Sequence, residues 1–209
     1  MVLTNTRTLV LIIPHWRVIA AGAAHDHLAA VVNKDRVVDV TPDGAEFGIT
    51  PGTPRREAQK LCADLKIIDD DEERNVRKFN SVVASLESVT PRIEITTGGW
   101  CSFPTRGPSR YFGGDQALAR VVAERTLKAL SVTLKTTEVP SVIQPRIGVA
   151  DSRFAAILAA TSESFSRVQV VVPKGSAAFL APFPVDVLAS KYSPLPEAEE
   201  LVDVFRRLG

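Results

Sequence analysis

This chain of 209 residues contains only two cysteines, no long apolar run and almost equal numbers of positive and negative side chains. The two cysteines, Cys62 and Cys101, match no metal-binding spacing and supply no disulfide framework, which favours a reducing compartment. The apolar run at residues 9–13 is too short to cross a bilayer and lacks the flanks of a signal peptide. These absences predict a cytoplasmic protein without a membrane anchor.

The overall charge gives no evidence of nucleic-acid binding. Lysine and arginine together number 25 against 24 aspartates and glutamates, for a formal net charge of +1. Any binding to DNA would therefore depend on local basic patches. With 45% hydrophobic residues, the chain is long enough for one large domain or two small ones with buried cores.

The periodicity of apolar residues predicts alternating strands and helices. Expected strands cover residues 8–13, 28–32, 37–40, 67–68, 92–96, 100–103, 143–149 and 168–172. Expected helices cover residues 17–24, 54–63, 69–89, 115–130, 152–160 and 197–208. Residues 44–52 are rich in turn formers, and Thr53 with Pro54 is expected to open the helix that follows. This order favours an α+β fold whose sheet is covered by helices on one face.

Four segments, in this order, resemble the palm and fingers of Y-family translesion DNA polymerases. They are LVLIIPHW (residues 9–16), FGITPGTPRREAQ (47–59), PRIEITTGGWCSFP (91–104) and RIGVADSRFAAILAA (146–160). Two more, TRGPSRYFGG (105–114) and FLAPFPV (179–185), are similar to the non-catalytic ImuB type of bacterial mutagenesis cassettes. The resemblance covers nearly the whole chain and is carried by the order of the segments more than by any one of them.

The resemblance implies a ferredoxin-like palm with a mixed sheet and helices on one face, a small inserted fingers domain and a truncated thumb. In this interpretation the palm takes residues 1–25 and 78–172, the fingers take 26–77, and the thumb begins at 173–209. The chain is expected to be a truncated piece that lacks the rest of the thumb, the little finger and the tail.

The resemblance also implies that the metal ligands of the polymerase reaction are missing. Nucleotidyl transfer uses two divalent metals held by carboxylates. The positions of these ligands correspond to Pro14 and Trp16 on the first strand and to Gly99 and Trp100 on the hairpin. Because none of these side chains binds a hard cation, we expect no catalytic residues, no metal, no cofactor and no enzymatic activity.

The nucleotide contacts are replaced as well. In active relatives the triphosphate and sugar are contacted at positions that correspond here to Pro42, Ala45, Ile157 and Ile19. Arg153 stands near a lysine position of the family's palm helix. A slip of one residue brings Asp43 or Glu46 close to the fingers positions, but neither rebuilds a metal cluster.

Several other residues have alternative interpretations. Pro14, Trp16 and Trp100 either fill the former cleft as a hydrophobic plug or line a repurposed ligand pocket. His25-Asp26-His27 suggests metal ligands but lacks a completing set, so a solvated loop is favoured. His15 has no nucleophile motif to serve as a base, and Cys101 is expected to be packed.

Two basic patches are candidates for DNA binding, with an ordinary solvated surface as the alternative for each. Arg55, Arg56 and Lys60 lie on one short predicted helix. A loop carries Arg106 and Arg110 near Tyr111 and Phe112, which offer aromatic rings for stacking. Arg153 joins these candidates through the resemblance. Such contacts predict non-specific, salt-sensitive binding to primer-template DNA.

The favoured hypothesis is a non-catalytic accessory protein of bacterial translesion synthesis and SOS mutagenesis, acting in the nucleoid. It would recruit or position an error-prone polymerase. The resemblance implies a sliding clamp, an ImuA-type protein and that polymerase as partners, mostly through regions outside this chain. One alternative is a divergent nucleotidyltransferase using displaced carboxylates such as Glu94, Asp115 or Asp151. Another is a protein-interaction module without DNA contact.

Overall fold

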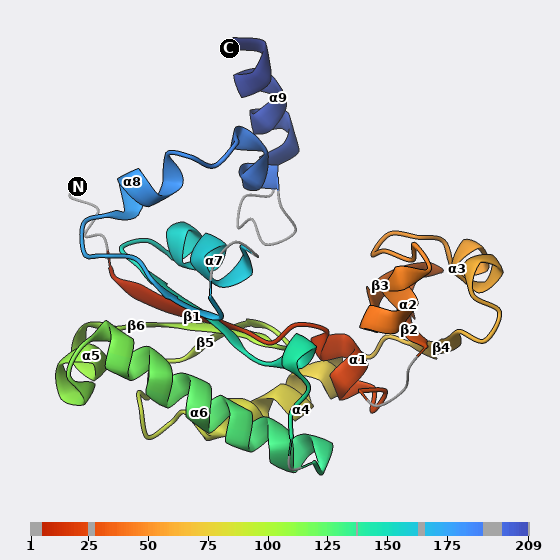
Figure 1. The fold of residues 1–209 in the computed structure, drawn as a ribbon, viewed down its shortest axis with the longest axis horizontal. Coiled ribbons are helices and arrows are strands. Elements are labelled where there is room, and N and C mark those ends of the chain that lie inside the picture. Colours follow the sequence, from red (N-terminus) through yellow and green to blue (C-terminus); the bar gives the residue numbers. More distant parts are fainter. Residues whose placement is uncertain (1–5, 25–27, 137, 163–165, 190–197, 209) are drawn as a thin grey trace. The chain divides into compact units, whose positions relative to one another are not determined.

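A computed structural model describes residues 6–24, 28–136, 138–162, 166–189 and 198–208 (Figure 1). Its internal contacts divide the chain into two units, one formed by residues 1–10, 104–119 and 147–209 and the other by residues 11–103 and 120–146. The strands are β1 (Thr8–Ile12), β2 (Ala29–Asn33), β3 (Arg36–Val40), β4 (Lys66–Asp69), β5 (Glu94–Thr97), β6 (Trp100–Pro104), β7 (Arg146–Ala150) and β8 (Val168–Val170).

Short and long helices alternate with these strands. The helices are α1 (Trp16–Ala20), α2 (Pro42–Glu46), α3 (Arg55–Leu61), α4 (Glu72–Ala84), α5 (Arg106–Phe112), α6 (Asp115–Leu134), α7 (Arg153–Thr161), α8 (Ser176–Leu180) and α9 (Ala198–Leu208), with 3₁₀ turns at Ser141–Ile143 and Val185–Ala189. No helix among the described residues is long and apolar enough to cross a membrane.

The larger sheet is mixed, as the α+β prediction requires. Its strand order is β5-β6-β1-β7-β8. β5 and β6 pair antiparallel, whereas β7 and β8 pair parallel. Within the first unit, Gly148 of β7 lies so close to α7 that a Cβ there would stand 2.7 Å from the backbone nitrogen of Ala160. Glycine at this position therefore permits the close packing of strand and helix.

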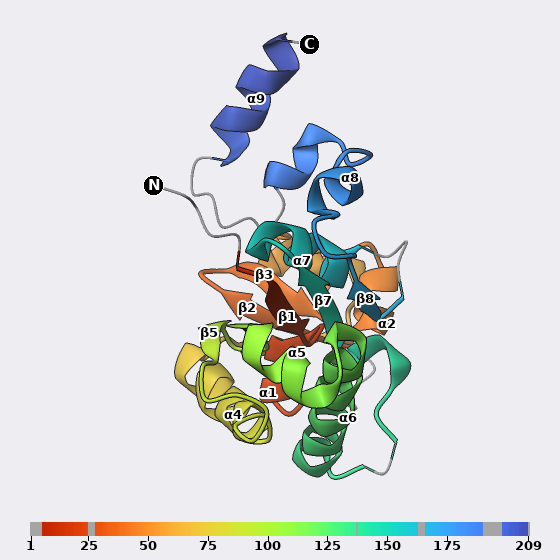
Figure 2. The same cartoon turned by 90° about the vertical axis from the view of Figure 1, so that its left-hand side faces the viewer.

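The smaller sheet has the order β3-β2-β4 and belongs to the second unit; its strands β2 and β3 are labelled in Figure 2. β2 and β3 form the predicted hairpin, whose turn residues Lys34 and Asp35 have φ of 47° and 60°. β2 is buried on both faces: Ala30 and Val32 pack into one apolar cluster, while Ala29 and Val31 pack into another. Burial on both faces explains why this strand is continuously apolar.

One expectation about turns holds in part and another is wrong. Residues 44–46, at the start of the expected turn-rich segment, belong to α2, because Thr41 Oγ1 accepts a hydrogen bond from Gly44 N and Pro42 suits the first turn. Turns follow at residues 47–48 and 51–52, as expected. The segment around Arg106 and Arg110, expected to be a loop, forms α5 and ends at Gly113 with a φ of 88°. Proline is tolerated in the first turn of a helix, so Pro108 does not break it.

Several helix boundaries also differ from expectation. Pro54, not Thr53, is the N-cap of α3, because the hydroxyl of Thr53 instead accepts a hydrogen bond from Thr50 N. Asp71 caps α4, which ends at Ala84 well before the expected boundary. α6 runs to Leu134, beyond the expected boundary. The strand expected at 143–149 begins only at Arg146, after a 3₁₀ turn.

Candidate functional site

The candidate site lies where β1 ends and the chain turns into α1, beside the β5–β6 hairpin of the same unit. Ile13 N donates a hydrogen bond of 2.8 Å to the carbonyl oxygen of Gly99, which ties the end of β1 to the hairpin turn. His15 then adopts a left-handed conformation with a φ of 52°. This turn directs the chain into α1, whose first residue is Trp16.

Trp16 is packed inside this site, with only 3% of its surface exposed. Its ring meets that of Phe79 edge to face at a centroid distance of 5.3 Å. The indole N–H donates a hydrogen bond of 3.0 Å to the backbone carbonyl of Asn75. The ring therefore has both an apolar partner and a satisfied polar group, which is the usual arrangement of a structural tryptophan.

The two glycines of the hairpin turn lie directly against Trp16. A Cβ at Gly98 would stand 2.9 Å from two atoms of the indole ring. A Cβ at Gly99 would stand 2.6 Å from Trp16 Cγ, and the φ of Gly99 is 84°. Any side chain at either position, including a carboxylate, thus requires Trp16 to move. The residue at 16 and the glycines at 98 and 99 are sterically matched to one another.

The predicted plug residues behave differently from one another. Trp16 is buried, in agreement with the plug interpretation, and leaves almost no surface to line a ligand pocket. Pro14 and Trp100 are both partly exposed. Trp100 stands opposite Thr97 in the hairpin register. The structure therefore brings Trp16 into contact with Gly99, and of the predicted plug residues it is the Trp16 side chain that fills this place.

Asp39, from β3, supports the turn that carries Trp16. One of its carboxylate oxygens accepts hydrogen bonds from Arg17 N at 3.1 Å and Val18 N at 3.3 Å, at the open end of α1. The other lies 3.2 Å from His15 Nδ1. Asp39 thus caps α1 from a different strand, which also accounts for His15 without any catalytic role.

Arg17 makes the second polar link, to the start of α4. Its guanidinium binds Asp70 and lies 3.0 Å from Glu72. Asp70, with a side chain 3% exposed, also accepts a hydrogen bond of 2.8 Å from the Asn75 amide. Burial alone would raise the pKa of Asp70, but the hydrogen bonds from Asn75, Arg17 and Asn33 hold this pKa below its usual range. Asp70 is therefore charged at neutral pH and committed to Arg17.

Two of the carboxylates named as displaced metal ligands are also committed to an arginine. In the other unit, Asp115 and Asp151 both bind Arg7, the latter at 2.8 Å. Asp115 also accepts a hydrogen bond from Ser109, and Asp151 one of 3.1 Å from Ser176. Burial would raise the pKa of Asp115, but its hydrogen bonds from Ser109 and Arg7 lower it overall. These carboxylates neutralise Arg7.

Other candidate residues lie in varied surroundings. Glu94 is exposed on β5, and no three His, Cys, Asp or Glu residues gather as a metal set within the described ranges. Ile19 and Ile157 are buried, so neither presents a surface to a nucleotide. Cys101 is fully buried, which raises its pKa to about 12 and leaves it a neutral thiol. His25, Asp26 and His27 lie outside the described residues.

The two residues predicted to correspond to triphosphate contacts lie on one helix with the two carboxylates that a one-residue shift of the alignment would bring to those positions. Pro42, Ala45, Asp43 and Glu46 all fall on α2, the short helix that follows β3. Asp43 lies in its first turn.

The basic candidates occupy three helices. Arg56 and Lys60 are exposed on α3, whereas Arg55 is half-buried and lies 3.7 Å from the exposed carboxylate of Asp69. Such an exposed pair is weak and remains open to exchange with a phosphate.

In the other unit, Arg106 and Arg110 are exposed on α5 beside Tyr111, which is 83% exposed. Tyr111 meets Phe112 edge to face at 4.9 Å. Arg153, by contrast, is partly buried at the start of α7.

The polar residues that hold the site were not found from the sequence. Asp39, Asp70 and Asn75 carry these links, and Arg7 carries those of the other unit; each acts on a partner far away in the chain. One signal was present: Asp39 interrupts an otherwise apolar strand, and a charge there requires a partner.

Comparison with known proteins places this fold. Two solved structures, described as "Insertion ternary complex of Dbh DNA polymerase" and "Dbh Ternary Complex (substrates partially disordered)", match with TM-scores of 0.71 and 0.68. Each is 13% identical in sequence; the matches cover 97% and 94% of this chain but 58% and 56% of the Dbh chains. No curated protein matches in sequence.

The mixed α+β architecture is therefore that of the Y-family polymerase Dbh. The model of the impB/mucB/samB family matches residues 20–161, more than half of the chain. The chain belongs to this family, and it is a Y-family DNA polymerase-like domain.

Proposed function

We propose that this chain is the palm and fingers of a non-catalytic, ImuB-like member of the family, which binds DNA and helps to position an error-prone polymerase. The observation that carries the proposal is the contact of Trp16 with Gly98 and Gly99. Of the positions that correspond to metal ligands, Trp16 and Gly99 touch each other and leave no room for a carboxylate. A site filled in this way by an indole offers no oxygen ligand to a hard cation.

The polar groups around Trp16 support the same proposal. Two acidic side chains beside Trp16 are already engaged: Asp39 caps α1, and Asp70 pairs with Arg17. Asp115 and Asp151, which the rival polymerase mechanism would use, are paired with Arg7. Moving any of these carboxylates to a metal would leave a partly buried arginine or helix end without its partner, which is costly.

DNA binding is proposed on weaker but independent grounds. The Dbh structures that match the fold are described as ternary complexes of a DNA polymerase. In this chain, Arg56 and Lys60 on α3 and Arg106 and Arg110 on α5 are exposed cations. They suit non-specific contact with a phosphate backbone, and Tyr111 adds an exposed ring for a base. The sliding clamp, an ImuA-type protein and an error-prone polymerase are the partners that the ImuB likeness suggests.

Fluorescence anisotropy of labelled primer-template DNA tests this function. The full chain is titrated over a salt series, with and without Mg²⁺ and the matching deoxynucleoside triphosphate. We expect an affinity that falls as salt rises, because phosphate contacts release counterions, and that is unchanged by Mg²⁺ and nucleotide. A gain in affinity that requires both Mg²⁺ and nucleotide would favour the divergent nucleotidyltransferase. An absence of binding at low salt would favour a protein-interaction module.

A further inference from the structure

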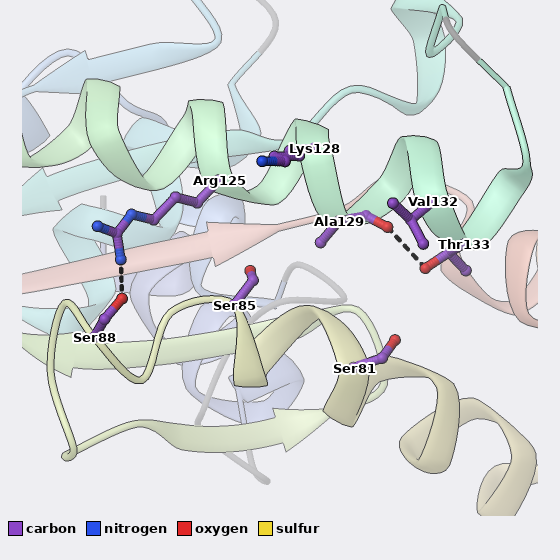
Figure 3. A pocket seen from close by; sticks show the side chains of 8 residues that line it. All are labelled: Ser81, Ser85, Ser88, Arg125, Lys128, Ala129, Val132 and Thr133. Carbon is purple, nitrogen blue, oxygen red and sulfur yellow. Dashed lines mark hydrogen bonds between the residues drawn. The ribbon is translucent and has the colours of Figure 1, made fainter.

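A groove of about 510 Å³ lies between the end of α4 and the second half of α6, within one unit of the chain (Figure 3). On one side, Ser81, Ser85 and Ser88 line it at the spacing of a helix face. The groove is separate from the surroundings of Trp16 described above, because none of its lining residues belongs to them.

The α6 side of the groove is a partly exposed stripe. Arg125, Lys128 and Val132 follow at three- and four-residue intervals, and Val132 is 73% exposed. The opposite stripe of α6, which includes Thr126 and Leu130, is buried. A helix that buries one stripe and presents a second, partly apolar stripe at a groove is suited to a further helix.

Two of the serine hydroxyl groups in the groove already donate hydrogen bonds within their own segment, so they do not require an acceptor from a bound partner. Ser81 Oγ donates a hydrogen bond of 2.7 Å to Lys78 O, and Ser85 Oγ donates one of 2.6 Å to Val82 O. With these protons already used within α4 and its C-terminal turn, the serine wall presents mainly methylene groups and acceptor oxygens. Apolar side chains can therefore pack on Ser81 and Ser85 without leaving the hydroxyl protons of these two residues unpaired.

The charge of the groove has one sign. Its charged lining residues are Arg125 and Lys128, and the lining contains no carboxylate. Arg125 binds the neutral hydroxyl of Ser88, as Figure 3 shows. Within the described part of the chain, neither cation is paired with an acidic group. The groove therefore combines a largely apolar floor with two positive charges at its rim.

We propose that this groove binds an acidic amphipathic helix of a partner protein. Apolar residues of that helix would pack on Ala129 and Val132, while its carboxylates would face Arg125 and Lys128. The seven residue steps from Arg125 to Val132 span about 10 Å at the rise of an α-helix, which fits two turns of a bound helix. Nucleic acid suits the groove less well, because two cations beside an apolar floor give few phosphate contacts. This inference does not depend on whether the chain has polymerase activity.

The probe for this test is a fluorescein-labelled alanine-based helical peptide with leucines along one face and glutamates beside them. Its binding to the full chain is measured by anisotropy, and the amides that shift are located by two-dimensional NMR. We expect shifts at Ser85, Ser88, Ala129 and Val132. A companion peptide with lysine in place of each glutamate is expected to bind at least about tenfold more weakly, because like charges then meet across the groove.

Substitutions on α6 make the test specific. Lys128→Glu should weaken binding of the glutamate peptide about tenfold, and Val132→Asp at least as much, because it puts a like charge on the apolar floor. Arg120→Glu makes a similar charge change at an exposed position of α6 outside the groove and should leave the affinity within about twofold. Lys128 and Val132 are exposed, so unchanged thermal melting should accompany both losses.

Other outcomes would overturn the proposal. Equal binding of the two peptides would remove the charge selection on which it rests. Absence of NMR shifts in the groove would remove the site itself. Duplex DNA that shifts the groove amides, with an affinity reduced by Lys128→Glu, would assign the groove to nucleic acid instead.

Discussion

The surroundings of Trp16 and the cluster around Arg7 lie in different units and are held together in different ways: the first by the packing of a large ring, the second by ion pairs. Around Trp16, an indole lies in direct contact with two glycines, and two of these three residues, Trp16 and Gly99, are at positions that we propose to correspond to metal ligands of active relatives. Around Arg7, two carboxylates survive but are held by a guanidinium and by hydroxyl groups. We therefore propose that Asp115 and Asp151 do not serve as displaced metal ligands, because each already neutralises a partly buried arginine.

The largest effect is expected from Gly99→Ala, which tests whether the contact between Gly99 and Trp16 stabilises the fold. The new Cβ would collide with Trp16 and impose a φ of 84° on alanine. We expect a loss of about 4 kcal/mol in the free energy of unfolding, measured by urea denaturation. The matched control is Gly48→Ala, where φ is 79° and nothing lies within 4 Å. It should lose only about 1 kcal/mol. Equal losses would contradict the role of Trp16.

The Arg7 cluster is broken by Arg7→Met, which leaves Asp115 and Asp151 partly buried without their cation. We expect a loss of about 3 kcal/mol at neutral pH, and a much smaller one for the exposed control Arg106→Met. Thermal and urea unfolding of both variants provide the measurement.

The same variant has a pH signature. The pKa of Asp115 is lowered in the folded chain. Its contribution to stability is therefore complete above the unfolded pKa of about 4 and is lost as the pH falls through the lower folded pKa. Arg7→Met should remove much of this contribution, so the difference in unfolding free energy between variant and parent should narrow below about pH 4. A constant difference would show that the ion pair is not its source.

Smaller losses of stability are expected when the two acidic partners of Arg17, Asp70 and Glu72, are neutralised one at a time. Asp70→Asn should cost about 2 kcal/mol, because the nearly buried Asp70 carboxylate accepts hydrogen bonds from three side chains. Glu72→Gln should cost less than about 0.5 kcal/mol, because the Glu72 side chain is 52% exposed. Urea unfolding of both variants at neutral pH measures the two losses. A Glu72→Gln loss as large as that of Asp70→Asn would mean that Arg17 depends on both acids alike.

The smallest effect concerns DNA. Arg56→Glu combined with Lys60→Glu should weaken anisotropy-measured binding by about tenfold at low salt and reduce its salt dependence. Arg77→Glu combined with Arg120→Glu makes the same change in net charge at two exposed positions outside α3, and as the control it should have a smaller effect. Equal effects would mean that net charge, and not the α3 surface, decides the affinity.

Much of the fold follows from local sequence, whereas the site depends on distant partners. The apolar runs of β1 and β2 and the cap at Ser152 predict their elements because each signal lies within the element itself. The helix α5 was missed because Gly107-Pro108 is typical of a turn. The sequence also favoured a buried Trp16. The close contact of its ring with Gly98 could not be predicted, because the two residues are far apart in the chain and meet only when it folds.

Paramagnetic NMR with Mn²⁺ and a deoxynucleoside triphosphate tests the central claim most directly. Mn²⁺ held by ligands beside the hairpin would broaden the amide signals of Gly98 and Gly99 far more than those of distant residues. Because Trp16 fills this place, Asp39 caps α1 and Asp70 is paired with Arg17, we predict no selective broadening of these two amides at any nucleotide concentration. Broadening confined to Gly98, Gly99 and their neighbours, and dependent on nucleotide, would contradict the account and indicate a working polymerase site.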